Sequence, residues 1–456
     1  MNDGRPLNWW GIVRLGLVQT ALGSIVVLTT STINRIMVVE LALPAALPGA
    51  LVALHYAVQI LRPRLGYGSD VGGRRTPWIV GGMAILALGG IGAAVATASM
   101  SDHPVFGIAL AVVAFLLIGL GVGASGTSLL VLLAKRVEEG RRAAAATTVW
   151  VMMIVGFIIT AGVAGHLLDP FSPMRLVVIA TAVSAIAFIV TLAAVWNVEG
   201  PSVLKSDKSA VKEIDKPQFR QALSEVWAEP QARRFTIFVF ISMLAYSAQD
   251  LILEPFAGSV FGYTPGESTK LAGVQHSGVL IGMLLVALAG SIGKGTRFAS
   301  LSMWTTGGCI ASAVALLGLV IAGFVGPIWP LRPTVFALGA ANGAFAVAAI
   351  ASMMALAGRG KESREGVRMG LWGAAQAVAF GLGGLFGAVA SDVARQALQS
   401  TGVAYASVFA FEAALFVIAA YLAIGVGNVG LAGSNPTSVR TNQLLTANLA
   451  KGNSYD

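Results

Sequence analysis

The sequence is poor in cysteine, in histidine and in charged side chains. It holds one cysteine, Cys309, and four histidines among 456 residues. A single cysteine excludes an intrachain disulfide framework and a metal cluster built on several cysteines. Charged residues make up 11% of the chain and hydrophobic residues 56%, and the mean hydropathy is +0.78. A soluble domain could not carry this composition on its surface, so the sequence predicts an integral membrane protein.

Motifs for nucleotide chemistry and for hydrolysis are missing as well. The 55 glycines form no Walker or dinucleotide-binding fingerprint between a strand and a helix. Because no Ser-His-Asp, metal-cluster or nucleotide constellation is found, we expect neither an enzyme nor a resident metal ion. The net charge of +9 follows the loops, which indicates membrane topology and attraction to anionic lipid head groups rather than nucleic-acid binding.

Hydrophobic runs long enough to cross a bilayer recur twelve times. They lie near 11–38, 43–61, 77–99, 105–134, 144–167, 174–196, 234–255, 270–292, 298–324, 331–357, 368–391 and 402–426. The sequence therefore predicts an all-α membrane protein with twelve transmembrane helices. Most of the 30 Lys and Arg residues fall at the amino terminus, in the loops after every second span, or in the tail. This distribution predicts that both termini are cytoplasmic.

The chain divides in the middle into two halves of six spans. We expect an N-terminal bundle at 1–196, a cytoplasmic linker with a short amphipathic helix at 197–233, a C-terminal bundle at 234–426 and a cytoplasmic tail at 427–456. Small residues echo between the halves, because Gly162 and Gly165 follow Trp150 at the same offsets at which Gly384 and Gly387 follow Trp372. A 6+6 pseudo-repeat of this kind is the architecture of the major facilitator fold.

The loop after the second span is rich in glycine and arginine. Its spaced residues are Gly66, Asp70, Gly73, Arg74 and Arg75. This spacing resembles the signature between the second and third helices of major facilitator transporters. The glycines allow a tight turn, and the arginines hold it on the cytoplasmic side. The basic residue usual after the aspartate is replaced by Val71, so an ordinary arginine-rich cytoplasmic turn stays an alternative.

The first and seventh spans end in polar side chains. The first carries a stripe that includes Thr29, Thr30, Asn34 and Arg35. The seventh ends with Asp250 and Glu254. Charged groups inside spans are costly and usually functional, so we hypothesise that Arg35 pairs with Asp250 or Glu254 where the halves meet. Alternatively, each side chain reaches the head groups or caps a helix end.

Two histidines occupy corresponding helices of the two halves. His55 lies in the second span and His276 in the eighth, each about three turns before its loop. A neutral imidazole in an apolar setting is a good axial ligand for a metal in a macrocycle; the alternative is a hydrogen bond to a neighbouring helix or to water. Glu412 is the only plausible mid-span carboxylate, which is weak support for a proton-driven pump.

Three blocks of sequence, at 14–79, 245–258 and 339–387, carry a resemblance to a known family. Through them the chain to about residue 430 resembles the bacteriochlorophyll-delivery branch of the major facilitator superfamily. This branch includes PucC, LhaA and a chain historically called a bacteriochlorophyll synthase subunit. The resemblance implies a multi-pass protein of the inner, or intracytoplasmic, membrane of a photosynthetic bacterium.

The resemblance also implies a function in pigment or antenna assembly. We expect a non-enzymatic factor that binds or delivers bacteriochlorophyll, with His55 and His276 as candidate magnesium ligands. Expected partners are the light-harvesting 1 or 2 antenna polypeptides, the reaction centre–light-harvesting 1 complex and bacteriochlorophyll synthase. Small residues on the outer face of the eleventh span are docking candidates for the antenna: Gly373, Gly381, Gly384 and Gly387. The alternatives are a secondary transporter of a porphyrin or other amphipathic solute, and a synthase subunit that transfers a prenyl group.

Overall fold

The computed structural model describes residues 7–61, 74–138, 141–199, 224–292, 300–357, 365–398 and 400–432. The described part of the chain is helical throughout. The first half contains α1 (Trp9–Val27), η1 (Leu28–Thr32), α2 (Ile33–Arg35), η2 (Ile36–Glu40), α3 (Ala46–Val58), η3 (Gln59–Leu61), α5 (Thr76–Ser99), α6 (Pro104–Arg136), α7 (Arg142–Leu167) and α8 (Pro173–Val195). The second contains α10 (Pro230–Phe261), α11 (Pro265–Ile292), α12 (Leu301–Val325), η6 (Gly326–Ile328), α13 (Leu331–Ala357), α14 (Glu365–Ala397) and α15 (Thr401–Ala432).

Eleven helical stretches of the described residues are long and apolar enough to cross a membrane, and the first of them comprises α1, η1, α2 and η2, from Trp9 to Glu40. The prediction of an all-α, multi-pass membrane protein is therefore confirmed. The second predicted span corresponds to the helical stretch Ala46–Leu61, which is shorter than the other spans. It is also shorter than the roughly 20 residues that a straight helix needs to cross the hydrocarbon core.

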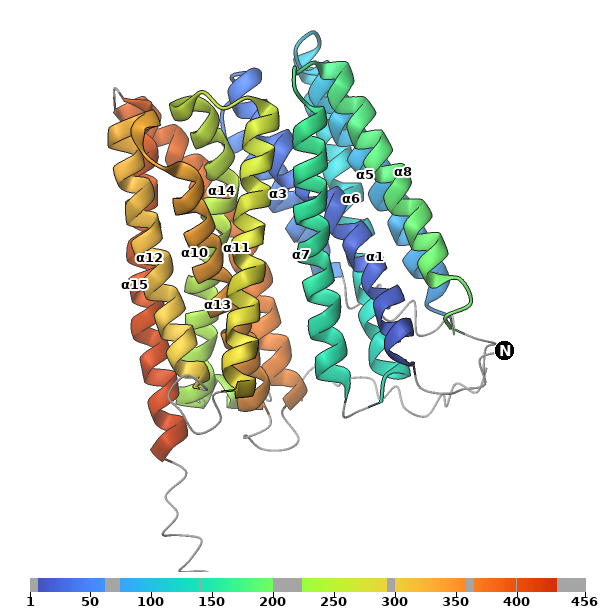
Figure 1. Ribbon diagram of the computed structural model, residues 1–456, viewed down its shortest axis with the longest axis vertical. Coiled ribbons are helices and arrows are strands. Elements are labelled where there is room, and N and C mark those ends of the chain that lie inside the picture. The colour runs from blue at the N-terminus through green and yellow to red at the C-terminus, as the bar shows by residue number, and fades with distance from the viewer. Residues whose placement is uncertain are drawn as a thin grey trace, which may run out of the picture.

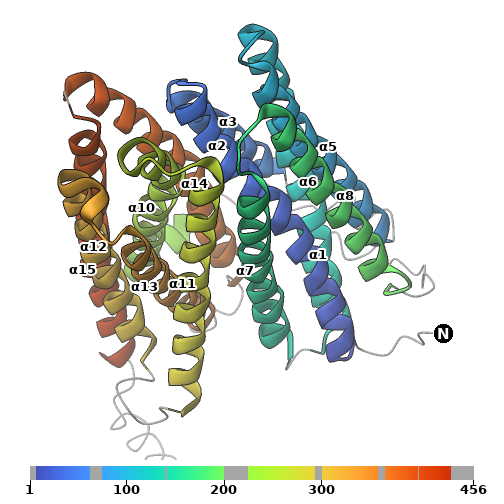
Figure 2. The ribbon, with the colours of Figure 1, turned by 45° about the horizontal axis from the view of Figure 1, so that its top comes forward.

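The helices form two groups that stand side by side (Figures 1 and 2). One hydrophobic cluster is built mainly from α1, α3 and α5–α8, and a second from α10–α15. The groups meet along two seams, in which α7 packs on α11 and α3 packs on α14. We call the end where α7 stops and α11 begins the far end, which is uppermost in Figure 1. The opposite end carries Glu199 and Glu229 and is called the linker end.

Glycine pairs allow the helices within each group to approach closely. On α11, Gly278 and Gly282 face α13, and on α13, Gly339 and Gly343 face α11. A Cβ atom added at any of these four positions would collide with a backbone carbonyl of the other helix. The two GxxxG motifs therefore interlock, as small residues do where van der Waals packing has to hold helices together in lipid.

The first membrane helix is interrupted by two π-helical turns, η1 and η2. They fall on the polar stripe that the sequence places at the end of this span. The hydroxyls of Thr29 and Thr30 both donate to the carbonyl oxygen of Val26, each at 2.9 Å. Such turns widen the helix and shift the register of the side chains beyond them, and they occur frequently at functional sites.

Candidate functional site

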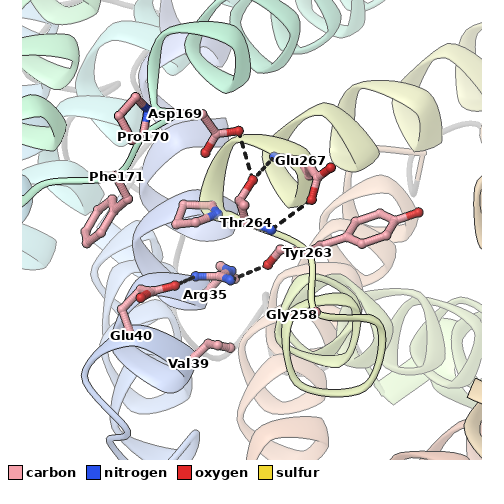
Figure 3. Close-up of a pocket in the computed structure, with 12 residues that line it drawn as sticks. Arg35, Val39, Glu40, Asp169, Pro170, Phe171, Gly258, Tyr263, Thr264 and Glu267 are labelled. Carbon is pink, nitrogen blue, oxygen red and sulfur yellow. Dashed lines mark hydrogen bonds and ion pairs between the residues drawn. The ribbon is translucent and has the colours of Figure 1, made fainter. Parts of the chain in front are cut away.

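Arg35 lies at the far end and lines a pocket between the two halves (Figure 3). The pocket has a volume of about 780 Å³ and is lined by both halves, with Glu40 and Asp169 from one and Tyr263 and Glu267 from the other. The side chain of Arg35 is 2% exposed. It forms an ion pair with Glu40 and donates a hydrogen bond to the carbonyl oxygen of Tyr263 at 2.6 Å. The guanidinium thus links the first helix to the loop between α10 and α11.

The ion pair of Arg35 differs from the predicted one. Glu40 is its partner, whereas Asp250 accepts a hydrogen bond from the amide of Gln275 at 3.1 Å. Arg35 also acts electrostatically on Glu254, so pairing with Asp250 or Glu254 across the halves stays a prediction, but the close ion pair in the structure is with Glu40. The reason is the π-helical turn from Ile36 to Glu40, whose i+5 register places Glu40 beside Arg35.

The remaining polar groups of the first helix have different tasks. Thr29 and Thr30 bond back to their own helix, as described above. Asn34 reaches the other half, where its amide donates to the carbonyl oxygen of Leu251 at 2.6 Å. The hydroxyls of Thr32 and Thr269 lie 3.0 Å apart across the same boundary. Thr29 and Thr30 therefore hydrogen-bond within their own helix, whereas Thr32 and Asn34 join the two halves.

Carboxyl groups lie inside the second half, more of them than the sequence indicates. Glu254 is 2% exposed and interacts with Ser31, Ser268 and Arg35. Glu412 is fully buried, and neither of its carboxyl oxygens has a hydrogen-bond partner among the described residues. Gln249 is also fully buried, and its side-chain amide has no hydrogen-bond partner in the part of the chain that the structure describes. Asp250 acts electrostatically on Glu412, although the two residues come from α10 and α15. Buried ionisable groups of this kind are costly and mark candidate functional positions in a membrane protein.

The two histidines occupy corresponding helices but have different surroundings. The Nδ1 atom of His276 donates to the carbonyl oxygen of Ala272 at 2.8 Å, which leaves the lone pair on Nε2. Its ring packs edge-on against Phe157 of α7, with the centroids 4.7 Å apart. In His55, by contrast, Nε2 accepts a hydrogen bond from the side-chain amide of Gln59 at 2.9 Å. Of the two histidines, only His276 has its Nε2 atom left for a ligand while Nδ1 is held by a backbone carbonyl.

The histidines and the pocket are separate features, since neither histidine lines the pocket. Phe157, the aromatic neighbour of His276, also lies against Gly23 of α1. His276 is therefore located on the seam between α7 and α11, and its neighbour Phe157 also contacts α1.

The loop signature falls mostly outside the described residues. The structure describes Arg74 and Arg75 but not Gly66, Asp70 and Gly73. The backbone N–H of Arg75 donates to the carboxylate of Glu199 at 2.6 Å, and that of Thr76 does so at 2.9 Å. Glu199 therefore caps the first turn of α5, where free N–H groups and the helix dipole favour a negative charge.

The predicted docking glycines of the eleventh span are mostly used inside the protein. Gly384 and Gly387 pack against α10, where an added Cβ atom would come within 2.7 Å of Leu251 and of the Ala248 carbonyl, respectively. Gly381 faces Tyr56 of α3. Gly373 alone of the four has no atom within 4 Å of such a Cβ position. An outward-facing position is wrong for Gly384 and Gly387, because these small residues bring α14 close to α10, whereas docking of antenna polypeptides on this span stays a prediction.

The arrangement of the helices is that of the major facilitator transporters. A crystal structure of the peptide transporter POT in complex with alafosfalin superposes with a TM-score of 0.68, over 93% of this chain and 97% of that one. At 14% sequence identity this similarity concerns the fold alone. A family model described as "PUCC protein" matches residues 32–430. The chain belongs to the PUCC family.

Two curated relatives support this membership. The chain is 54% identical over 420 residues to the "Bacteriochlorophyll synthase 44.5 kDa chain" of Rhodobacter capsulatus, covering 92% of this chain and 96% of that one. It is 30% identical over 437 residues to "Protein PucC" of Rhodobacter capsulatus, covering 91% of each. The family resemblance predicted from the sequence is therefore confirmed.

Proposed function

We propose that this chain is a non-enzymatic membrane assembly factor for light-harvesting complexes of the LH1 or LH2 type. It would bind or deliver bacteriochlorophyll and dock the antenna polypeptides while they receive their pigment. The supporting relatives carry names that refer to bacteriochlorophyll synthase and to PucC. The proposal assigns no catalytic residue to this chain; a role as synthase subunit would instead require prenyl transfer by this chain alone.

The proposal includes a membrane topology and a domain organisation. The protein would lie in the inner, or intracytoplasmic, membrane of a bacterium with twelve spans and both termini in the cytoplasm. Its parts would be the bundle 1–196, the linker 197–233, the bundle 234–426 and the tail 427–456. The basic residues of the sequence and the two separate hydrophobic clusters support this organisation. The linker end would then face the cytoplasm.

The observation that carries the pigment part is the geometry of His276. Its Nε2 atom would hold the magnesium of the pigment, and the Ala272 carbonyl would keep the ring in the required tautomer. Phe157 would lie beside the pigment, and α1, α7 and α11 would exclude water from it. His55 would have to give up its hydrogen bond from Gln59 to act in the same way. Bacteriochlorophyll, when bound, supplies only light absorption at this site.

Partners of the chain are proposed from the same family names. Antenna polypeptides would be the principal partners, with the reaction centre–LH1 complex or bacteriochlorophyll synthase as neighbours in the membrane. Among the glycines considered for docking, Gly373 is the position that faces open space in the structure. A single-span antenna helix would contact this part of α14.

The pigment site is tested by purifying the full-length protein and its histidine variants from pigment-containing membranes. We expect near-infrared absorption per mole of protein to fall several-fold in His276→Ala and less in His55→Ala. The control is His166→Ala, because His166 is exposed at the end of α7. Wild-type protein that is colourless but still co-purifies with antenna polypeptides would remove the pigment part of the proposal.

A transporter of a porphyrin or another amphipathic solute is the second candidate. The superposition with a peptide transporter and the buried Glu412 favour it. Uptake of a porphyrin into vesicles that contain the purified protein, reduced by Glu412→Gln, would support transport. The assembly proposal expects uptake equal to that of empty vesicles.

A further inference from the structure

Two aspartates tie the halves of the protein together at the far end. Asp169, just after α7, accepts hydrogen bonds from the hydroxyl of Thr264 at 2.8 Å and from the backbone N–H of Gly266 at 3.1 Å. Asp392, near the end of α14, accepts from the backbone N–H groups of Ala45 at 3.0 Å and Ala46 at 2.7 Å. In each case the donors begin a helix of the opposite half, α11 for Asp169 and α3 for Asp392.

The two contacts lie at closely corresponding places of the internal two-fold repeat. Pro265, which opens α11, precedes His276 by eleven residues, and Pro44, just before α3, precedes His55 by the same eleven. The acceptors correspond as well, since both aspartates follow the glycine pairs that repeat in α7 and α14. The repeat thus places one carboxylate of each half over the first turn of a helix in the other.

This geometry has a plain physical basis. The first N–H groups of a helix have no partner within the helix, and the helix dipole makes this end attractive to a negative charge. Both carboxylates are partly shielded from solvent, the side chain of Asp392 being 15% exposed. Close backbone contacts flank both positions: Gly165 meets Gly266 in one seam, and Gly49 meets Ala388 in the other. The two carboxylates therefore connect helices that already pack closely against each other.

At the linker end, the comparable carboxylate contacts among the described residues stay within one half. Glu199 caps α5 of its own half. Glu229 forms a bidentate ion pair with the buried Arg368 of its own half, at 2.7 and 2.9 Å. In the described part of the chain, the carboxylates that accept hydrogen bonds across the halves thus lie at the far end, where Arg35 also donates to the carbonyl oxygen of Tyr263.

We propose that Asp169 and Asp392 form a two-fold latch that closes the far end of the protein. Each carboxylate holds the start of one helix in the opposite half, and the far end opens only when both contacts break. While the latch is closed, the halves can separate only at the linker end. This inference goes beyond the proposed function, because it describes how the halves move whether or not pigment binds.

The latch is tested by distance measurement between two spin labels on the full-length protein. Labels on cysteines placed at Met174 and Ile328 report on the far end, since these side chains are 71% and 87% exposed and belong to different halves. The native Cys309 is fully buried and stays unlabelled. A second pair at Trp10 and Ser300, both exposed, reports on the linker end.

In the parent protein we expect a single short distance at the far end. In the double variant Asp169→Ala/Asp392→Ala we expect a longer distance to become the major population, and in each single variant a minor one. The matched control is Asp102→Ala, because Asp102 is exposed in the far-end loop between α5 and α6. Its distance distribution should equal that of the parent.

Two results would overturn the latch. One is an unchanged far-end distance in the double variant; the other is full opening by one single variant with no effect of the other. The milder double variant Asp169→Asn/Asp392→Asn retains an acceptor oxygen at each position, so it should open the far end less. If the double alanine variant does not fold, the double asparagine variant provides the test in its place.

Discussion

Removal of the buried guanidinium at the far end offers a sharp test of how the halves are joined. In Arg35→Met the volume of the side chain is nearly kept, but the ion pair with Glu40 and the bond to the Tyr263 carbonyl are lost. Glu40 is 33% exposed, so solvent screens its charge and its share is at most about 1 kcal/mol. A hydrogen bond from a charged donor contributes about 1.5–3 kcal/mol. The expected loss in the free energy of unfolding is therefore about 1.5–4 kcal/mol.

The measurement is reversible unfolding of the purified full-length protein in mixed micelles, followed by tryptophan fluorescence. Arg332→Met is the matched control. Arg332 is exposed and contacts the ring of the same Tyr263, with its guanidinium carbon 5.9 Å from the ring centroid. Such an exposed cation–π contact contributes about 0.5–1 kcal/mol, so the control should lose less than Arg35→Met.

A charge exchange identifies the partner of Arg35. The double variant Arg35→Glu/Glu40→Arg should regain part of the stability that Arg35→Glu loses, because the ion pair is restored in the opposite sense. The double variant Arg35→Glu/Asp250→Arg should not. Rescue by the Asp250 exchange alone, or equal losses in Arg35→Met and Arg332→Met, would refute the assignment of Glu40 as partner.

Two further variants probe the interior of the second half. Gly282→Ala should destabilise the protein by about 1–3 kcal/mol, because its Cβ atom would meet the carbonyl of Ala340 in α13. Gly290→Ala in the same helix meets no atom within 4 Å and should change stability by less than about 0.5 kcal/mol; equal effects in the same unfolding assay would contradict the interlocked packing. Glu412→Leu should raise the free energy of unfolding by about 1–3 kcal/mol, because it removes a buried carboxyl group without a partner among the described residues. A less stable Glu412→Leu variant would show that the carboxyl group has a stabilising partner.

The helices of this fold could be predicted because the length of an apolar run and the position of basic loops can be read directly along the sequence. The helices and the division into two groups follow from them. The contacts of Arg35 do not, since they depend on π-helical turns that no residue pattern indicates. The direction in which Gly384 and Gly387 face follows from the neighbours of α14, which a repeat of small residues does not reveal.

The histidines illustrate the same limit on a finer scale. Sequence symmetry treats His55 and His276 as equivalent, and their helices do correspond. One glutamine, Gln59, makes the difference, because it lies one helical turn after His55 and bonds its Nε2 atom. The corresponding side chain after His276 is Leu280, which offers no such donor. This contrast was readable from the sequence once the helical register was known.

The latch and the candidate pigment ligand share one seam, and this has a mechanical consequence. Asp169 fixes the start of α11 to the end of α7, and His276 meets Phe157 of α7 ten residues further along α11, roughly 15 Å away. A flat ligand on the Nε2 atom of His276 would have to separate α7 from α11 at that level. Because Asp169 holds α7 and α11 together at the far end, these two helices can separate only toward the linker end. A ligand bound at His276 would therefore stabilise the closed far end, and the closed far end would favour binding of the ligand. The ligand would enter and leave the site from the linker end.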